Sequence, residues 1–318
     1  MSTPRFGVLL STRLAALNGA DPEAFVLQAE RAEAAGFDSV WLGDSLLARP
    51  RPEPLVLLAG IAARTRRIGL GTAVLLPALR HPVTTAHAIA TLDALSRGRL
   101  VLGVGAGFPY PASARELACV GVPFEERVPR LVEALVIWRA LFAGQGPTSH
   151  EGRFWAFDDA LLTPQPARPG GPPIWLGGNA PGALRRVARL ADGWIPTSAS
   201  PKVFTEGLAR IRDEAARHGR DPETIEPALL ATLHVDPDRA TAQRELRAFM
   251  EPYYGVPLEV LTQILGCFAG SAAECAEWLA GYAEAGVRHF VLRFAASDQQ
   301  AQQERVAAEV LPALTART

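Results

Sequence analysis

A turn of two glycines and an asparagine, Gly177-Gly178-Asn179, follows the short apolar run Ile174–Leu176 and precedes a helical pattern with Pro181 in its first turn. The first backbone amides of a helix have no partner within the helix, so they bind anions, and a phosphate group suits them. The same residues would also make an ordinary turn between a strand and a helix. The turn is therefore a candidate phosphate site.

A single carboxylate, Asp44, follows another apolar run, Ser39–Gly43. At such a position a carboxylate either caps the next segment or hydrogen-bonds a ligand. Further along, Gly103, Gly105 and Gly107 are spaced G-x-G-x-G, so they do not match the G-x-G-x-x-G dinucleotide-binding fingerprint. Small residues there either let a strand pack tightly or leave room for a flat ligand against the backbone.

Other catalytic signatures are missing from the sequence. It has no H-E-x-x-H, no G-x-S-x-G and no cluster of histidines with carboxylates, which disfavours metalloenzyme and hydrolase chemistry. Its three cysteines, Cys119, Cys267 and Cys275, form no C-x-x-C pair, so neither a zinc site nor a disulfide framework is predicted. Without an evident nucleophile or acid–base pair, a redox cofactor would have to supply the chemistry, and no metal is expected.

Composition and charge narrow the class of protein further. The 318 residues carry a net charge of −1, which gives no electrostatic reason to bind nucleic acid or an anionic membrane surface. No apolar stretch reaches the ~18–20 residues that span a bilayer. The N-terminal run MSTPRFGVLLSTR indicates a first strand rather than a signal peptide. We therefore expect a cytoplasmic protein that acts on a small molecule.

Short apolar runs alternate with helical patterns along the chain. The expected strands are Phe6–Leu10, Ser39–Gly43, Ile68–Ala73, Leu100–Val104, Ile174–Leu176, Trp194–Ile195, Leu229–His234 and His289–Arg293. Continuous apolar runs form parallel sheets buried on both faces, and the repeated strand–helix unit predicts a (β/α)8 TIM barrel of the α/β class. In such a barrel the site lies at the carboxyl ends of the strands, where Asp44, Gly105 and Thr197 all fall.

We predict one domain, residues 1–318, with two inserted segments. Residues 144–173 and 251–270 interrupt the strand–helix alternation, and segments this long often act as lids or binding walls. The stretch 109–122 is predicted to be a polar, proline-bearing loop. Tyr110 and Arg293 are candidate substrate contacts, or else ordinary core or surface residues.

Several ordered motifs resemble those of the bacterial luciferase-like monooxygenases, a family that includes enzymes using the deazaflavin coenzyme F420. The motifs are AGFDSVWLGDS (35–45), RIGLGTAVLLPALRHP (67–82), ATLDALSRGRLVLGVGAGF (90–108), GVPFEERVPRLVEALVIWRALFAG (121–144) and PPIWLGGNAPGALRRVARLADGWIP (172–196). The resemblance implies a (β/α)8 barrel that forms a homo-oligomer, usually a dimer or tetramer, and holds FMN or F420 in its mouth. It also implies a non-prolyl cis peptide at Ala73-Val74, behind the ring.

The resemblance also implies site residues. The expected cofactor contacts are Asp44, Thr72, Ala73, Val74, Gly105, Ala106, Gly107, Gly177, Gly178, Asn179 and Thr197, with the phosphate at Gly177-Gly178. Asp44 and Ser45 stand where catalytic residues are expected. Many F420 enzymes have Asp-His in place of Asp44-Ser45, and some have an acid in place of Phe108. The imidazole–glutamate pair of sugar-phosphate dehydrogenases is therefore absent, which disfavours that activity.

Three functions fit these residues. In the first, reduced FMN from a separate reductase acts with O2 to oxidise a small, largely apolar substrate. In the second, F420 exchanges a hydride with an organic substrate without oxygen chemistry. In the third, the barrel binds flavin without turnover. A lyase or isomerase acting on phosphorylated sugars is disfavoured, because the only lysine, Lys202, lies at the start of a helix.

Overall fold

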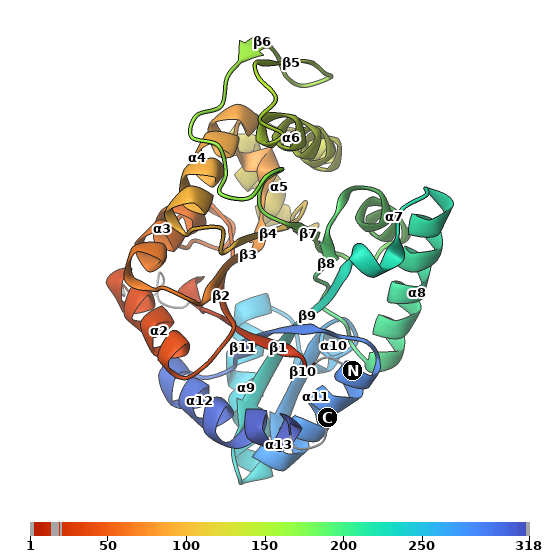
Figure 1. The fold of residues 1–318 in the computed structure, drawn as a ribbon. Coiled ribbons are helices and arrows are strands. Elements are labelled where there is room, and N and C mark those ends of the chain that lie inside the picture. Colours follow the sequence, from red (N-terminus) through yellow and green to blue (C-terminus); the bar gives the residue numbers. More distant parts are fainter. Residues whose placement is uncertain (1–2, 14–18, 20, 316–318) are drawn as a thin grey trace. The chain divides into compact units, whose positions relative to one another are not determined.

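The computed structural model describes residues 3–13, 19 and 21–315, and its fold is the predicted (β/α)8 barrel (Figure 1). One sheet holds its strands in the order β10-β9-β11-β1-β2-β3-β4-β7-β8, and β8 also pairs with β9, which closes the barrel. These strands are β1 (Arg5–Leu9), β2 (Ser39–Leu42), β3 (Gly69–Leu75), β4 (Leu100–Val104), β7 (Ile174–Leu176), β8 (Gly193–Trp194), β9 (Glu226–Val235), β10 (Gly266–Gly270) and β11 (His289–Phe294).

Helices alternate with the strands. They are α2 (Glu23–Ala34), α3 (Pro54–Arg64), α4 (Pro82–Leu95), α5 (Pro111–Cys119), α6 (Arg127–Phe142), α7 (Pro181–Leu190), α8 (Pro201–Arg217), α9 (Arg239–Tyr254), α10 (Leu258–Leu261), α11 (Ala272–Glu284), α12 (Gln299–Arg305) and α13 (Leu311–Thr315). Proline opens α3, α4, α5, α7 and α8, where its missing N–H removes no helical hydrogen bond. Within the described ranges, no helix is both long and apolar enough to cross a membrane.

The structure differs from the sequence prediction in the segment 109–122. This segment contains the helix α5 rather than only a loop, with Pro111 at its first position and Leu117 on its buried side. The inserted segment 144–173 contains a two-stranded antiparallel hairpin, β5 (Thr148–Glu151) and β6 (Ala156–Ala160), and the segment 251–270 contains α10 and β10. Both insertions therefore carry some regular structure.

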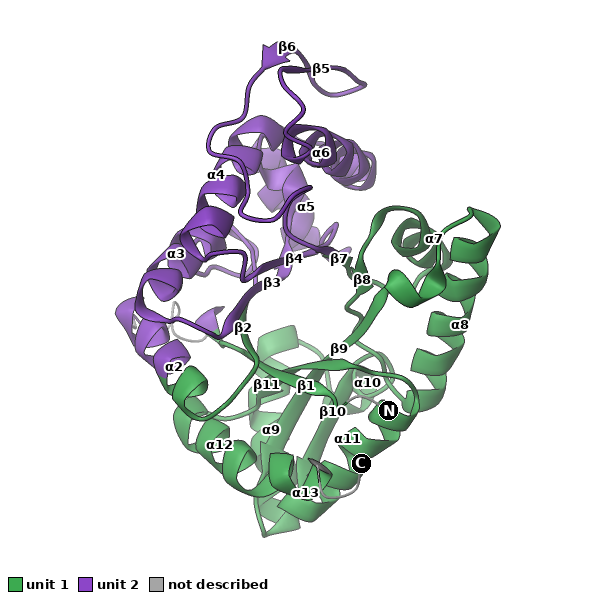
Figure 2. Cartoon of the chain, in the orientation of Figure 1, with its two compact units in different colours: residues 1–11, 31–41, 175–318 green, residues 12–30, 42–174 purple. Residues whose placement is uncertain are grey.

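The chain forms two compact units, coloured separately in Figure 2. Unit 1 consists of residues 1–11, 31–41 and 175–318. In it β11 pairs in parallel with β1 on one side and β9 on the other, and the rings of Phe6 and Phe290 stack with centroids 5.4 Å apart. The range 1–318 extends past the described residues at both ends, and its being a single domain stays a prediction.

A buried histidine, His289, contacts side chains from two other strands of unit 1. His289 Nε2 lies 2.8 Å from Ser39 Oγ, which also accepts a hydrogen bond of 2.7 Å from Trp41 Nε1. The indoles of Trp41 and Trp175 pack against the imidazole, with ring centroids 5.6 and 5.3 Å from it. Burial lowers the pKa of His289 to about 3. The imidazole is therefore neutral in the folded protein at neutral pH.

Unit 2 consists of residues 12–30 and 42–174. Its strands β3 and β4 pair in parallel, and the β5–β6 hairpin extends beyond α6 (Figure 1). Glu133 on α6 accepts hydrogen bonds from the backbone amides of Phe154 and Trp155, at 3.1 and 3.0 Å. A half-buried carboxylate thus fastens the hairpin to the helix.

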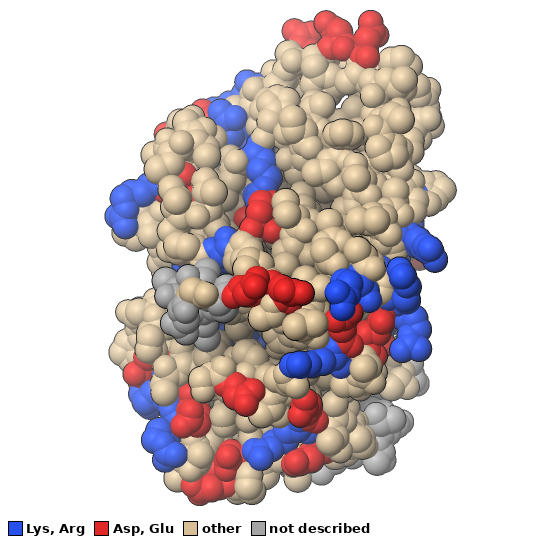
Figure 3. Space-filling model, turned by 90° about the vertical axis from the view of Figure 1, so that its left-hand side faces the viewer, with Lys and Arg blue, Asp and Glu red and all other residues tan. Residues whose placement is uncertain are grey.

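Charged side chains on the face shown in Figure 3 are of both signs and are interspersed with neutral ones. This mixture matches the near balance of 32 lysines and arginines against 33 aspartates and glutamates. Among the described residues on that face, no extended field of one sign is present to attract a polyanion.

Candidate cofactor-binding site

The end of β3 carries an irregular backbone. The peptide bond Ala73-Val74 is cis, as the resemblance implied, and the pairing of β3 with β4 shifts register between Thr72 and Leu75. Thr72 is buried, and its Oγ1 donates a hydrogen bond of 2.7 Å to the carbonyl of Gly103. This bond ties the start of the bulge to β4, so that the backbone of Ala73 and Val74 leaves the regular ladder at a fixed place.

Glycines at the end of β4 make room beside this bulge. A Cβ on Gly105 would lie 2.5 Å from Cγ2 of Val74, a distance that carbon atoms do not reach without a shift, so glycine is required there. Gly107 has a φ of +80°, which side chains rarely permit. Ala106 adds only a methyl group between them. The segment therefore presents backbone and one small side chain, a surface suited to a flat ring.

Asp44 forms a buried ion pair. Its carboxylate, 3% exposed, accepts bonds of 2.5 and 3.0 Å from the Arg80 guanidinium and one of 2.9 Å from the backbone amide of Leu76. Burial raises the pKa of Asp44, while Arg80 and the Leu76 amide oppose that effect. Arg80 also contacts Glu53, which caps α3. Asp44 thus holds the backbone just after the bulge in place.

Ser45 is hydrogen-bonded to a buried glutamate. Its hydroxyl donates to Glu116 Oε1 at 2.8 Å and accepts from the amide of Arg49 at 2.8 Å. Glu116, on α5, also accepts from the amides of Leu47 and Ala48. The carboxylate therefore organises the turn that follows β2, and the one hydroxyl proton of Ser45 is directed to it.

Aromatic and aliphatic side chains lie near the same strand ends of unit 2. Phe108 stacks on Tyr110 with centroids 5.7 Å apart, and the Arg49 guanidinium lies 5.0 Å from the centre of the Tyr110 ring. Phe108, Leu46 and Leu47 are each about half exposed. This part of the unit offers apolar surface to a ligand, and Tyr110 as a substrate contact stays a prediction.

The turn after β7 has the form expected of an anion site. Gly178 has a φ of +105°, and its carbonyl accepts a bond of 3.0 Å from Trp194 Nε1. Asn179 Nδ2 donates to the carbonyl of Thr197 at 2.5 Å, and Gly178 and Asn179 are exposed. The N-cap residue of α7 is Ala180, whose methyl group accepts no hydrogen bond. Pro181 has no N–H and the Ala183 amide donates to the Ala180 carbonyl at 2.7 Å, so the amide of Gly182 is the first-turn amide that is left for a ligand.

Arg293 is buried near the end of β11. Its guanidinium donates to Thr232 Oγ1 at 2.8 and 3.1 Å and to the hydroxyl of Tyr254 at 3.0 Å, and it lies 4.8 Å from the centre of the Tyr253 ring. Burial lowers the pKa of Arg293, but the two tyrosines outweigh that effect and the pKa is raised. The cation is thus satisfied by hydroxyl groups and aromatic faces, and a substrate contact stays a prediction.

The expected site residues lie at the carboxyl ends of strands. Unit 2 holds Asp44, Ser45, Thr72, Ala73, Val74, Gly105, Ala106 and Gly107, and unit 1 holds Gly177, Gly178, Asn179 and Thr197. Their roles toward a cofactor stay predictions. Sequence reasoning missed Arg80 and Glu116, which lie 36 and 71 positions from their partners, too far for any local pattern. No three potential metal ligands converge in the part of the chain that the structure describes.

The structure combines a (β/α)8 barrel, a bulge at the end of β3 and a glycine turn between β7 and α7. The family profile of luciferase-like monooxygenases matches residues 4–260, and the chain belongs to this family. Members of the family are F420- or flavin-dependent oxidoreductases, which makes this chain an oxidoreductase by descent.

Proteins of similar sequence or structure align with most of this chain. An F420-dependent glucose-6-phosphate dehydrogenase of Beutenbergia cavernae is 33% identical, with 90% of this chain and 91% of that protein covered. A phthiodiolone/phenolphthiodiolone dimycocerosates ketoreductase of Mycobacterium tuberculosis is 32% identical, over 67% of this chain and 61% of that protein. The structure of an F420-dependent secondary alcohol dehydrogenase has a TM-score of 0.84 at 23% identity, with 98% of this chain and 99% of the other covered. This last likeness shows the shared fold.

Proposed function

We propose that this protein is an F420-dependent oxidoreductase that transfers a hydride between the deazaflavin and a small, largely apolar organic substrate. The observation that carries the proposal is likeness along nearly the whole chain. Relatives 28–33% identical to it, over at least 90% of its length, are named F420-dependent glucose-6-phosphate dehydrogenases.

The residues present fit such a group. Gly105, where a Cβ would lie 2.5 Å from Cγ2 of Val74, keeps the side chains of β4 off the bulge, and Gly178 takes a φ of +105° beside the first turn of α7. The first feature suits a planar ring and the second suits its phosphate. When bound, F420 supplies a ring carbon that gives or accepts a hydride.

The protein's own part is to hold in place the backbone against which the ring would lie. Thr72 fixes the start of the bulge to β4, and Asp44 fixes its end through the Leu76 amide. Because both side chains are buried, these bonds are shielded from solvent and hold the bulge in place. We assign Asp44 a positioning role on this basis.

We further propose a substrate other than a sugar phosphate. The proton of Ser45 is directed to Glu116, which is itself occupied by two backbone amides, so this pair does not offer the acid–base function that an imidazole would. Phe108 presents a half-exposed aromatic ring where sugar-phosphate dehydrogenases of the family have an acid. An apolar carbonyl compound or alkene fits this lining better than a polyol.

An FMN-dependent monooxygenase, supplied with reduced flavin by a partner reductase, is the second candidate. The observation that favours it is the same apolar surface at Phe108, Leu46 and Leu47, since oxygen transfer to an apolar substrate needs a dry site more than an acid–base pair.

Separate equilibrium titrations with F420 and with FMN, followed by cofactor fluorescence, test the choice. We expect a Kd for F420 at least about ten-fold below that for FMN. Tighter binding of FMN, together with O2 consumption when reduced FMN is supplied, would replace this proposal by the second candidate. Binding of neither cofactor would overturn both.

A further inference from the structure

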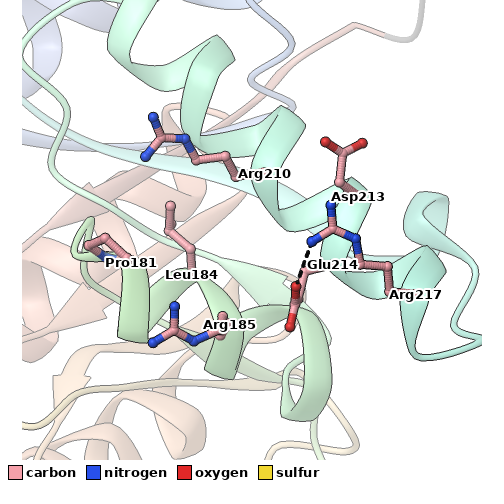
Figure 4. Close-up of a pocket in the computed structure, with 7 residues that line it drawn as sticks. All are labelled: Pro181, Leu184, Arg185, Arg210, Asp213, Glu214 and Arg217. Carbon is pink, nitrogen blue, oxygen red and sulfur yellow. Dashed lines mark hydrogen bonds and ion pairs between the residues drawn. The ribbon is translucent and has the colours of Figure 1, made fainter.

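A groove with arginines along its sides lies between α7 and α8 in unit 1 (Figure 4). It has a volume of about 200 Å³, and it is lined by Pro181, Leu184, Arg185, Arg210, Asp213, Glu214 and Arg217. Leu184 is buried and forms part of the floor, while the arginines extend from the exposed faces of the two helices.

Two of these arginines have no ion-pair partner among the described residues. Arg217 is paired with Glu214, at 3.4 Å, and Glu214 also lies 3.2 Å from His218 Nε2. Among the described residues, no carboxylate forms an ion pair with Arg185 or Arg210. In Figure 4 both of these guanidinium groups point toward the side of the groove where Pro181 lies, and the Asp213 carboxylate points away from them.

A third arginine adds to the charge at this end of the groove. A Cβ on Gly182 would lie 3.6 Å from Nη1 of Arg186 and 3.9 Å from Nη2 of Arg185, so both guanidinium groups lie over the first turn of α7. Burial lowers the pKa of Arg186, and the charge of Arg185 lowers it further. Like charges held this close favour an anion between them.

The groove is lined from Pro181 onward, and the candidate phosphate turn lies just before this residue in the sequence. Gly177, Gly178 and Asn179 precede the N-cap residue of α7, and Arg185 follows Asn179 by six residues, or about 9 Å along a helix axis. An anionic chain that leaves the phosphate turn along α7 therefore meets Arg185 and Arg186 within its first two turns. Arg210 faces the same space from α8.

We propose that Arg185, Arg186 and Arg210 bind the carboxylates of the oligoglutamate tail of F420. This inference rests on the proposed function, and it names the part of the cofactor that FMN lacks. A flexible chain bearing one carboxylate per unit suits separated guanidinium groups, because each arginine can form a bidentate pair with a different carboxylate. The groove thus serves as a selectivity element for the deazaflavin cofactor over a simple flavin phosphate.

The test compares F420 without glutamates, F420 with several glutamates, and FMN, each titrated against three proteins. The proteins are the wild type, the double variant Arg185→Gln/Arg210→Gln and the control Arg189→Gln/Lys202→Gln. The control changes the net charge of the same two helices by the same amount at exposed positions outside the groove.

We expect the wild type and the control to bind the long-tailed F420 about ten-fold or more tightly than the tailless form. In the groove variant this preference should fall to about two-fold or less, while the affinity for tailless F420 and for FMN stays unchanged. The preference of the wild type should also fall at high salt, because surface ion pairs are screened.

Three outcomes overturn the inference. One is equal binding of long-tailed and tailless F420 by the wild type, which leaves the proposed function standing. Another is an unchanged tail preference in the groove variant. The third is binding of no F420 at all, which removes the proposed function as well. All variants change exposed side chains, and thermal unfolding checks that each remains folded.

Discussion

Asp44 and Arg80 join the end of β2 to the segment after β3. The carboxylate is 3% exposed and the Arg80 side chain 20%, so the pair is shielded much more than an ordinary surface ion pair. The same arginine contacts Glu53, whose side chain is 41% exposed. Arg80 therefore has one buried and one exposed carboxylate partner. The contribution of each ion pair to the free energy of unfolding can be compared by changing Asp44 or Glu53.

We expect Asp44→Asn to lower the free energy of unfolding by about 2–4 kcal/mol, because it leaves a partly buried cation without its main partner. Glu53→Gln should cost below about 1 kcal/mol, since an exposed pair contributes little and glutamine still accepts the α3 cap. Urea unfolding of both variants measures the difference. Equal losses would contradict a structural role for the buried pair.

The cysteines differ in environment. Cys119 is exposed, whereas burial raises the pKa of Cys267 to about 11 and that of Cys275 to about 12. At pH 8 an aromatic disulfide reagent should therefore label one thiol rapidly in the native protein and three in denaturant. Cys119→Ser should abolish the rapid phase. Rapid labelling that persists in this variant would show that the two other thiols open to solvent.

At the scale of elements, the turn before α7 is expected to bind the cofactor phosphate, and this can be tested with a single substitution. Asn179→Asp places a negative charge beside its first turn with almost no change of shape. Two like charges about 4 Å apart near a surface repel by roughly 1–4 kcal/mol, so cofactor affinity should fall about ten-fold or more. The measurement is the Kd for F420.

Asn179→Ala is the matched control for that variant. It removes the bond from Asn179 to the Thr197 carbonyl without adding charge. If alanine weakened binding as much as aspartate, the lost bond rather than repulsion would explain the effect, and the phosphate would have to be placed elsewhere.

The elements that sequence reasoning found are those with strong local signals. Buried strands such as Leu100–Val104 are continuous apolar runs, and helices such as α7 begin at a proline that follows a turn. The elements it missed lack such signals. β5 (Thr148–Glu151) is polar and mostly exposed, and β10 (Gly266–Gly270) contains two glycines, so neither resembles a strand by composition.

The candidate site was predictable only in part, for a similar reason. Its glycines and Asp44 follow strands directly, and the position of a strand end can be inferred from the sequence. The partners Arg80 and Glu116 are set by how unit 2 packs, and no periodicity connects them to Asp44 or Ser45. The backbone of the site can thus be inferred from one chain, while its hydrogen-bond network cannot.

At the scale of the whole molecule, His289 links stability to pH. Its pKa is about 3 in the folded protein, because it is buried, and 6.5 is its ordinary value. The unfolded chain therefore binds more protons between these pH values. The stability that comes from the neutral imidazole is fully present above about pH 6.5 and is lost as the pH falls toward 3.

Urea unfolding at a series of pH values checks this expectation. Below pH 6.5 the free energy of unfolding of the wild type should fall by up to about 1.4 kcal/mol per pH unit more steeply than that of His289→Asn, which cannot titrate. Asparagine keeps a polar group near Ser39. Parallel curves for the two proteins would show that this histidine is not the titrating group.

Unit 1 joins segments that lie far apart in the sequence, and this affects how it can fold during synthesis on the ribosome. β1 ends at Leu9, but its neighbour β11 begins only at His289. At a rate of about 5–20 residues per second, roughly 15–55 s pass between the emergence of the two strands. During that interval one edge of an apolar segment has no native partner, so this edge stays open to pairing with other chains until β11 has emerged.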